Sequence, residues 1–260
     1  MEKISSFQNP KVKLLSRLLQ SSSQRRESGL FVVEGRRELE HCLEAGFEAD
    51  SIFICPEISR EPVPGHTGNA RFFEVTRDIY SRLAYREGTE GIIAEMRFKA
   101  TGLSELQPGE SPLIMVLESV EKPGNLGAVL RSADAAGADA VLICDPLTDL
   151  YNPNLIRASI GAVFTVPTVA CTSGEAISFL KEKGIRILTA QLQDSSLYYD
   201  YDMTGGTAIV MGTESTGLTD IWRQAADAHI RIPMLGNLDS LNVSVSAAIL
   251  LFEAVRQRRK

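Results

Sequence analysis

The 260-residue sequence lacks any apolar run that approaches the roughly 20 residues needed to cross a bilayer. Its first residues, MEKISSFQNPKVKLL, also lack the uninterrupted apolar stretch of a secretory signal peptide. Cysteine and histidine are scarce, at four and three residues, and no cysteine pair has the C-x-x-C spacing of a zinc or redox site. We therefore expect a protein of the reducing cytoplasm with no metal site. The cysteines are Cys42, Cys55, Cys144 and Cys171.

Basic residues are outnumbered by acidic ones, and the net charge of −6 argues against a protein that binds nucleic acid over most of its surface. The first 26 residues are an exception, because they carry several basic side chains and a single acid, Glu2. This segment could contact phosphates, or it could be the solvated face of an amphipathic helix. The sequence leaves both possibilities open. The basic residues are Lys3, Lys11, Lys13, Arg17, Arg25 and Arg26, and the inward face of the alternative helix would be Val12, Leu15, Leu18 and Leu19.

The composition, 44% hydrophobic and 23% charged, indicates a folded chain that is long enough for two domains. The segment KATGLSELQPGESP at residues 99–112 is rich in glycine, proline and polar residues, which is typical of a linker. We predict a small α/β domain over residues 1–98 and a larger domain over residues 113–260. The smaller one is expected to have strands at 30–35, 51–56, 71–75 and 91–98, and helices at 36–46 and 76–85.

The larger domain has a regular rhythm of apolar strands and helices. Strands that are apolar almost throughout and are separated by helices predict a parallel sheet covered on both faces, an α/β fold. The expected strands are 113–120, 140–144, 166–170, 185–192 and 207–212. The expected helices are 124–137, 152–164 and 174–184, and 221–233 is expected to hold a short helix with a short strand.

Ligands of parallel α/β sheets bind outside the carboxyl ends of the strands, a rule that selects three loops. In the first, a helix begins at KPGNLG, and its free N–H groups could accept an anion. Alternatively, the segment is only a tight turn from strand to helix. This segment lacks the G-x-G-x-x-G spacing of dinucleotide-binding proteins. Arg131 follows on the same helix, among small and apolar residues, where a guanidinium calls for a carboxylate or phosphate partner.

The second loop places Gly212, Glu214 and Gly217 after an apolar strand. The glycines allow a close backbone approach to a ligand, and Glu214 could accept a hydrogen bond from a hydroxyl or guanidinium group. Alternatively, Thr213 or Ser215 could cap the helix that follows.

The third loop ends in SLNVSVSAAILLFEAV, where a strand-like alternation at 241–245 overlaps a helical pattern from Ala247 onward. Buried serine and asparagine side chains without partners cost roughly 1–3 kcal/mol each. We therefore interpret this overlap as a turn entering a helix, with Ser240 near the N-cap and the first turn used for recognition. Asn242 and Ser244 supply its short polar groups.

Together the three loops resemble the motifs of the SpoU (TrmH-like) branch of the SPOUT RNA methyltransferases. The family's N-x-G-x-x-x-R motif is matched by Asn125, Gly127 and Arg131. The other two motifs are matched by Gly212, Glu214, Gly217 and Leu218, and by the run from Ile232 to Val245. Thr213 is a departure, because many relatives have asparagine there. The segment FVVEGRRELEHCLEAG also resembles the substrate-binding domain of many members, which is similar to a small ribosomal protein of the L30e type.

The resemblance implies S-adenosylmethionine-dependent methylation of a ribose 2′-hydroxyl in structured RNA, with ribosomal RNA as the expected substrate. It also implies a deep trefoil knot in the larger domain, a homodimer formed through that domain, and an active site that borrows residues across the interface. The backbone groups of Gly212, Ile232 and Leu241 would hold the cofactor. The smaller domain would bind RNA by its shape and phosphates.

The resemblance identifies Arg131 as the residue closest to the chemistry. Because guanidinium stays protonated, we expect it to clamp an RNA phosphate and stabilise the developing alkoxide rather than act as a base. Asn125, Glu214, Ser240 and Asn242 would orient Arg131 and the ribose. The alternatives are a transfer RNA methyltransferase and a non-catalytic RNA-binding or ribosome-assembly factor. A dinucleotide-dependent oxidoreductase is disfavoured by the missing glycine fingerprint.

Overall fold

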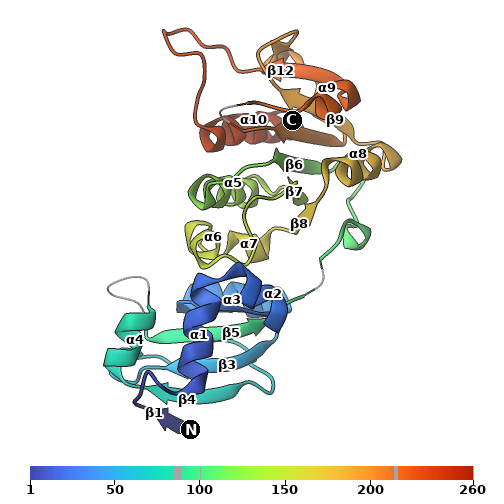
Figure 1. The fold of residues 1–260 in the computed structure, drawn as a ribbon. Coiled ribbons are helices and arrows are strands. Elements are labelled where there is room, and N and C mark those ends of the chain that lie inside the picture. Colours follow the sequence, from blue (N-terminus) through green and yellow to red (C-terminus); the bar gives the residue numbers. More distant parts are fainter. Residues whose placement is uncertain (85–89, 100, 214–215, 260) are drawn as a thin grey trace. The chain divides into compact units, whose positions relative to one another are not determined.

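The computed structural model describes residues 1–84, 90–99, 101–213 and 216–259. The chain forms two compact units, labelled by element in Figure 1. Unit 1 consists of Met1–Ala100 together with Asp149–Thr165, and unit 2 consists of Thr101–Thr148 together with Val166–Lys260. The segment Asp149–Thr165 lies inside the domain predicted over residues 113–260 but packs in unit 1. None of the described helices is long and apolar enough to cross a membrane.

Unit 1 contains a five-stranded sheet in the order β1-β4-β3-β5-β2. The strand β5 runs antiparallel to β2 and β3, whereas β4 pairs in parallel with β1 and β3. The four longer strands were expected from their apolar patterns, but the three-residue edge strand β1 was not. The strands are β1 (Glu2–Ile4), β2 (Leu30–Glu34), β3 (Ala49–Ile54), β4 (Arg71–Val75) and β5 (Ile92–Arg97).

The basic N-terminal segment folds as an amphipathic helix, one of its two predicted alternatives. Helix α1 (Pro10–Gln20) begins at the N-cap Asn9 and buries Val12, Leu15 and Leu18. The following helix, α2 (Ser22–Ser28), carries the buried Arg25, whose Nε donates to Asp149 at 2.7 Å. The other helices of this unit are α3 (Arg36–Glu44), α4 (Arg77–Leu83), α6 (Pro153–Ala158) and α7 (Ala162–Thr165).

The single helix predicted over residues 152–164 was wrong, because the chain forms α6 and α7 instead. Ile160 and Gly161 between them have φ values of 55° and 80°, which break the helical hydrogen-bond ladder. Both short helices belong to unit 1, where Tyr151 stacks on the fully buried Phe31 with ring centroids 4.4 Å apart. Aromatic packing therefore holds this later segment of the chain on the earlier one.

Unit 2 contains a seven-stranded, entirely parallel sheet, which confirms the predicted α/β class. The strand order is β10-β12-β9-β11-β6-β7-β8, so consecutive strands are joined by crossovers. The central strands are buried along their whole length, as their continuous apolar sequences indicate. The strands are β6 (Leu113–Glu118), β7 (Ala140–Cys144), β8 (Thr168–Cys171), β9 (Arg186–Ala190), β10 (Ser196–Leu197), β11 (Thr207–Met211) and β12 (Ala228–Arg231).

Helices cover both faces of this sheet (Figure 1). Helices α8 (Ser173–Glu182) and α9 (Asp220–Ala225) pack on the face that includes Ile114 and Val116. Helices α5 (Pro123–Ala136) and α10 (Val243–Arg258) pack against each other, and α10 also contacts β6 and β11. One-turn 3-10 helices occur at Leu103–Glu105 and Tyr198–Asp200. This arrangement brings the last helix of the chain to the middle strands.

Candidate cofactor pocket and active site

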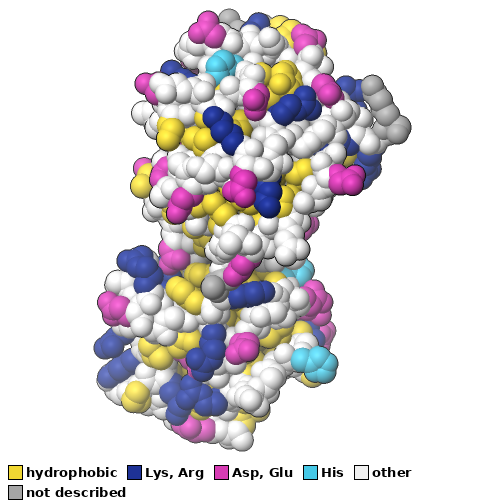
Figure 2. Space-filling model, turned by 90° about the vertical axis from the view of Figure 1, so that its right-hand side faces the viewer, with side chains coloured by type: hydrophobic (Ala, Val, Ile, Leu, Met, Phe, Trp, Pro, Cys, Tyr) yellow, Lys and Arg dark blue, Asp and Glu magenta, His cyan; other side chains and the backbone are white. Residues whose placement is uncertain are grey.

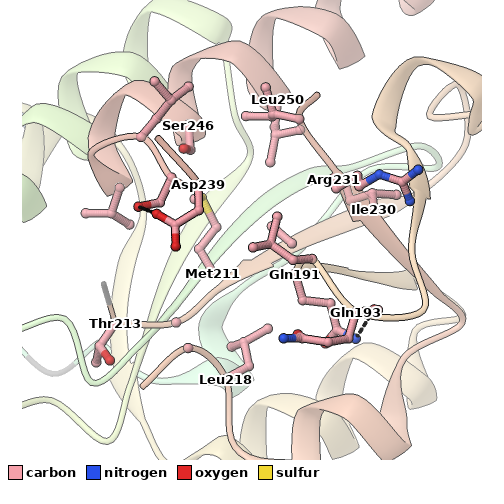
Figure 3. Close-up of a pocket in the computed structure, with 18 of the residues that line it drawn as sticks. Gln191, Gln193, Met211, Thr213, Leu218, Ile230, Arg231, Asp239, Ser246 and Leu250 are labelled. Atoms are coloured by element: carbon pink, nitrogen blue, oxygen red, sulfur yellow. Dashed lines mark hydrogen bonds between the residues drawn. The ribbon is translucent and has the colours of Figure 1, made fainter. Parts of the chain in front are cut away.

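A cavity of about 380 Å³ opens at the carboxyl ends of β9, β11 and β12. Its size falls within the roughly 300–1,000 Å³ typical of small-molecule sites. Ser246 and Leu250 project into it from α10, while Leu218 lies on the opposite side (Figure 3). Two of the three predicted loops, the second and the third, supply much of the wall. Further lining residues are Gln191, Gln193, Met211, Arg223, Ile230, Arg231, Met234 and Asp239.

The three residues predicted to hold the cofactor, Gly212, Ile232 and Leu241, all line this one cavity. The position of Gly212 admits no side chain, because a Cβ atom there would lie 2.2 Å from the carbonyl oxygen of Gly217. Gly217 itself has a φ of 68°, and its N–H donates to the carbonyl of Thr213 at 3.1 Å. The loop therefore folds back on itself and lies close to the cavity.

A buried carboxylate that the sequence analysis missed fastens the end of this loop. Glu118, at the end of β6, is only 3% exposed. It accepts hydrogen bonds from the backbone N–H of Thr219 at 2.9 Å, from the Thr219 hydroxyl at 2.6 Å and from the Ser173 hydroxyl at 3.3 Å. Ser173 also accepts a hydrogen bond from Trp222 Nε1. A glutamate that ends the apolar run LIMVLE was the available signal for this network, since a buried charge needs such partners.

The third loop, where the strand-like and helical patterns overlap, contains a helix N-terminus, as predicted. The N-cap is Asn242, and Ser240 lies two residues before it. The Asn242 Oδ1 accepts from the Ser244 backbone N–H at 2.9 Å and from its hydroxyl at 2.6 Å. Ser240 instead lines the cavity, and its hydroxyl donates to Asp239 at 3.2 Å. The serine and asparagine side chains therefore find partners in the turn itself.

The first and third predicted loops meet through two amides, since Asn242 Nδ2 donates to Asn125 Oδ1 at 3.1 Å. Neither asparagine lines the cavity, and Arg131 does not line it either. Arg131 is exposed on α5, so water hydrates its guanidinium and burial does not force a protein partner on it. Glu214 lies outside the described residues. The catalytic roles expected of these residues stay predictions.

The parallel sheet, the cavity at its strand ends and the glycine-constrained loop define an α/β protein with a small-molecule site of nucleotide size. Family comparison narrows this class. The family model described as the SpoU rRNA Methylase family matches residues 112–252, and an MRM3-like substrate binding domain matches residues 9–94. The chain belongs to the SpoU rRNA methylase family, which confirms the resemblance and the expectation of an RNA methyltransferase.

Three relatives cover almost the whole chain. A crystal structure of an RNA 2′-O ribose methyltransferase is 40% identical, covers 99% of this chain and 100% of its own, and has a TM-score of 0.85. An AdoMet-bound rRNA methyltransferase from Sinorhizobium meliloti is 28% identical, covers 98% and 97% of the two chains, and has a TM-score of 0.89. The 23S rRNA (guanosine(2553)-2′-O)-methyltransferase RlmP of Bacillus subtilis is 28% identical over 97% of this chain and 98% of its own.

Proposed function

We propose that the chain transfers a methyl group from S-adenosylmethionine to a ribose 2′-hydroxyl of ribosomal RNA. The observation that carries this proposal is the single cavity lined by Gly212, Ile232 and Leu241, in a chain of the SpoU rRNA methylase family. Relatives that align over nearly the full length are named for 2′-O methylation of RNA, and one of them acts on 23S rRNA. These names favour ribosomal over transfer RNA, and an rRNA substrate suits the predicted cytoplasmic location.

The lining residues fit S-adenosylmethionine. The absent side chain at Gly212 leaves backbone at the surface of the cavity, and Leu218, Ile230 and Leu250 offer apolar walls for a purine. Gln191 donates through Nε2 to the Gln193 carbonyl at 2.9 Å, while its buried Oε1 has no partner among the described residues. A ligand that carries an N–H donor would satisfy this oxygen, because a buried acceptor without a partner is costly.

The cofactor, when bound, supplies a methyl group activated by a positively charged sulfur. The protein then has to hold the ribose hydroxyl in line with that methyl group and accommodate one released proton, and positioning of this kind accounts for much of the rate. We assign Arg131 to an RNA phosphate and to the charge that develops on the ribose oxygen, where its planar fork offers two N–H donors. The paired Asn125 and Asn242, with Ser240, orient the ribose. Glu214 is assigned to the same task.

A homodimer would bring these groups together. Arg131 lies outside the lining of the cavity in its own subunit, so we propose that it serves the cavity of a second copy. Helix α10 leaves Val245 and Phe252 about half exposed, and the third loop leaves Leu235 96% and Leu238 75% exposed. Apolar side chains of this size at the surface favour a protein interface.

We further propose that residues 1–98 form an L30e-like domain that binds the RNA, and that residues 113–260 form the catalytic domain with residues 99–112 as the linker. The match of residues 9–94 to an MRM3-like substrate binding domain supports the first assignment. In unit 2 the chain returns from β12, next to the edge of the sheet, to α10 on the middle strands β6 and β11. This return path supports a trefoil knot in which the C-terminal segment passes through an earlier loop.

The test is transfer of labelled methyl groups from S-adenosylmethionine into 23S, 16S and transfer RNA, followed by mapping of 2′-O-methyl sites. We expect label in ribosomal RNA. Arg131→Lys keeps the charge but loses the two-pronged donor, so its rate should fall about 100-fold while calorimetry finds S-adenosylmethionine binding unchanged. A wild-type rate for Arg131→Lys would contradict the assigned role. Label in transfer RNA alone, or in no RNA, would support the predicted alternatives instead.

A further inference from the structure

A charged cluster lies in unit 1 at the end of the sheet where β3 and β4 begin and β5 ends. Asp50, whose side chain is 8% exposed, accepts a hydrogen bond from Arg71 on one carboxylate oxygen and from Arg97 on the other. The Nη2 group of Arg71 also donates to the Ser51 hydroxyl at 3.2 Å. Burial alone would raise the pKa of Asp50, but the hydrogen bonds from Arg71 and Ser51 and the positive charges of both arginines hold it below its ordinary value.

Asp50 holds the two arginines in place, but most of their N–H donors make no hydrogen bond within the described residues. Within the described residues, their hydrogen bonds engage only the Nη2 group of each guanidinium. The side chains of Arg71 and Arg97 remain 62% and 56% exposed. Each guanidinium has five N–H donors, so most of the donors on both arginines remain available for a ligand. Asp50 therefore binds both guanidinium groups and fixes their orientation.

These arginines line a cavity of about 670 Å³. The turn at residues 66–70 forms another side, where Gly68 has a φ of 56° and the Ala70 N–H donates to the Thr67 carbonyl at 3.1 Å. His66 and Asn69 on this turn add polar groups to the lining. Figure 2 views the end of unit 1 at which β5 stops and shows lysine and arginine side chains gathered on it. The cavity is large enough for a nucleotide.

We propose that this cavity is an anchoring site for a phosphodiester group of the RNA substrate, gripped by Arg71 and Arg97. The proposal rests on the proposed function, which makes RNA the ligand of this chain. Two guanidinium groups held by one carboxylate match the geometry of a phosphate. Each guanidinium can donate two parallel N–H hydrogen bonds to phosphate oxygens. The site would position the RNA without reading its sequence.

An acidic residue at the same cavity offers a test in the opposite direction. Glu48 is exposed among the lining residues, and with Asp50 it balances the two arginine charges. A carboxylate next to a bound phosphate repels it, so Glu48→Gln should tighten RNA binding by about three-fold. This substitution leaves both arginines on Asp50 and therefore leaves the fold undisturbed. A weaker complex would mean that the ligand of this cavity is not an anion.

The main experiment measures binding of in vitro transcribed 23S rRNA to the full-length protein over a series of salt concentrations. Arg71→Ala and Arg97→Ala should each weaken binding about ten-fold at low salt. Each should also reduce the slope of log K against log salt by about one, as expected for a lost phosphate contact. The matched control is Arg77→Ala, which removes an equally charged, exposed side chain at the start of α4. It lies beyond the other end of β4, a strand that spans about 13 Å at roughly 3.3 Å per residue. It should leave the slope unchanged.

Melting temperatures and the charge-preserving variant Arg71→Lys separate a lost contact from a lost fold, because Arg71→Lys should bind RNA more tightly than Arg71→Ala. Affinity within two-fold of wild type for both alanine variants, with unchanged salt slopes, would overturn the proposal. Equal losses in all three alanine variants, Arg77→Ala included, would also overturn it, because the effect would then be overall charge. If the wild type binds rRNA in this pattern but transfers no methyl group, the proposed enzymatic function fails and the anchoring site stands.

Discussion

Replacing Glu118 with glutamine removes the charge that fastens the cavity loop while keeping the shape of the side chain. The carboxylate receives two hydrogen bonds from Thr219, on the backbone and on the hydroxyl, and a third from Ser173. Hydrogen bonds to a charged group contribute about 1.5–3 kcal/mol and neutral ones about 0.5–1.5 kcal/mol. Losing the charge on the two short bonds therefore costs about 2 kcal/mol. Gly217 and Leu218, which line the cavity, directly precede Thr219.

The loosened loop should raise the dissociation constant for S-adenosylmethionine about ten-fold, and 2 kcal/mol sets an upper bound of about thirty-fold. Calorimetric titration measures this constant, and the rate at saturating cofactor should stay near wild type because Glu118 does not touch the cavity. The matched control is Glu121→Gln, an exposed carboxylate shortly after the same strand, which should bind the cofactor normally. A lowered melting temperature with unchanged cofactor affinity would refute the reasoning, since Glu118 would then support the fold but not the loop.

Two further substitutions test the tightly packed Gly212 and the buried Glu95. Gly212→Ala should reduce S-adenosylmethionine binding more than 100-fold in the same calorimetry, because the added Cβ atom would clash with the Gly217 carbonyl oxygen. A near-normal affinity would contradict this expectation and show that the loop can move to accommodate the methyl group. Glu95 concerns pH: burial raises its pKa from 4.5 to about 7, so the folded chain keeps a proton that the unfolded chain releases. The resulting stability is fully present below pH 4.5 and is lost as the pH rises to 7, by about 3 kcal/mol. The melting temperature should therefore fall between pH 5 and 7 in the wild type more than in Glu95→Gln, and parallel curves would contradict the shift.

Much of the fold follows from local patterns that the sequence displays. Continuous apolar runs such as LIMVLE and AVLIC are buried central strands, and the rule that ligands bind at the carboxyl ends of parallel strands led to the loops around the cavity. Gly212, Ile232 and Leu241 could be grouped in advance because the second family motif contains Gly212 and the third contains Ile232 and Leu241. Such inferences succeed where a residue's environment is set by its neighbours in the chain.

Other features depend on partners that are remote in sequence. The edge strand β1 exists because Glu2–Ile4 pairs with β4, about seventy residues later, and the break at Ile160 and Gly161 lets α6 and α7 pack in unit 1. Helix periodicity carries no record of such contacts, so the sequence predicted one helix there.

What the sequence determined by itself was the type and order of most elements, the loops that carry polar side chains, and the family. The tertiary structure alone decided which charges are partnered. Glu118 looks like the end of an apolar strand and Asp50 like the start of one, yet each is a buried carboxylate that gathers donors from separate segments. The reason is physical: a buried charge is tolerated only where several elements converge to solvate it, and only folding brings those elements together.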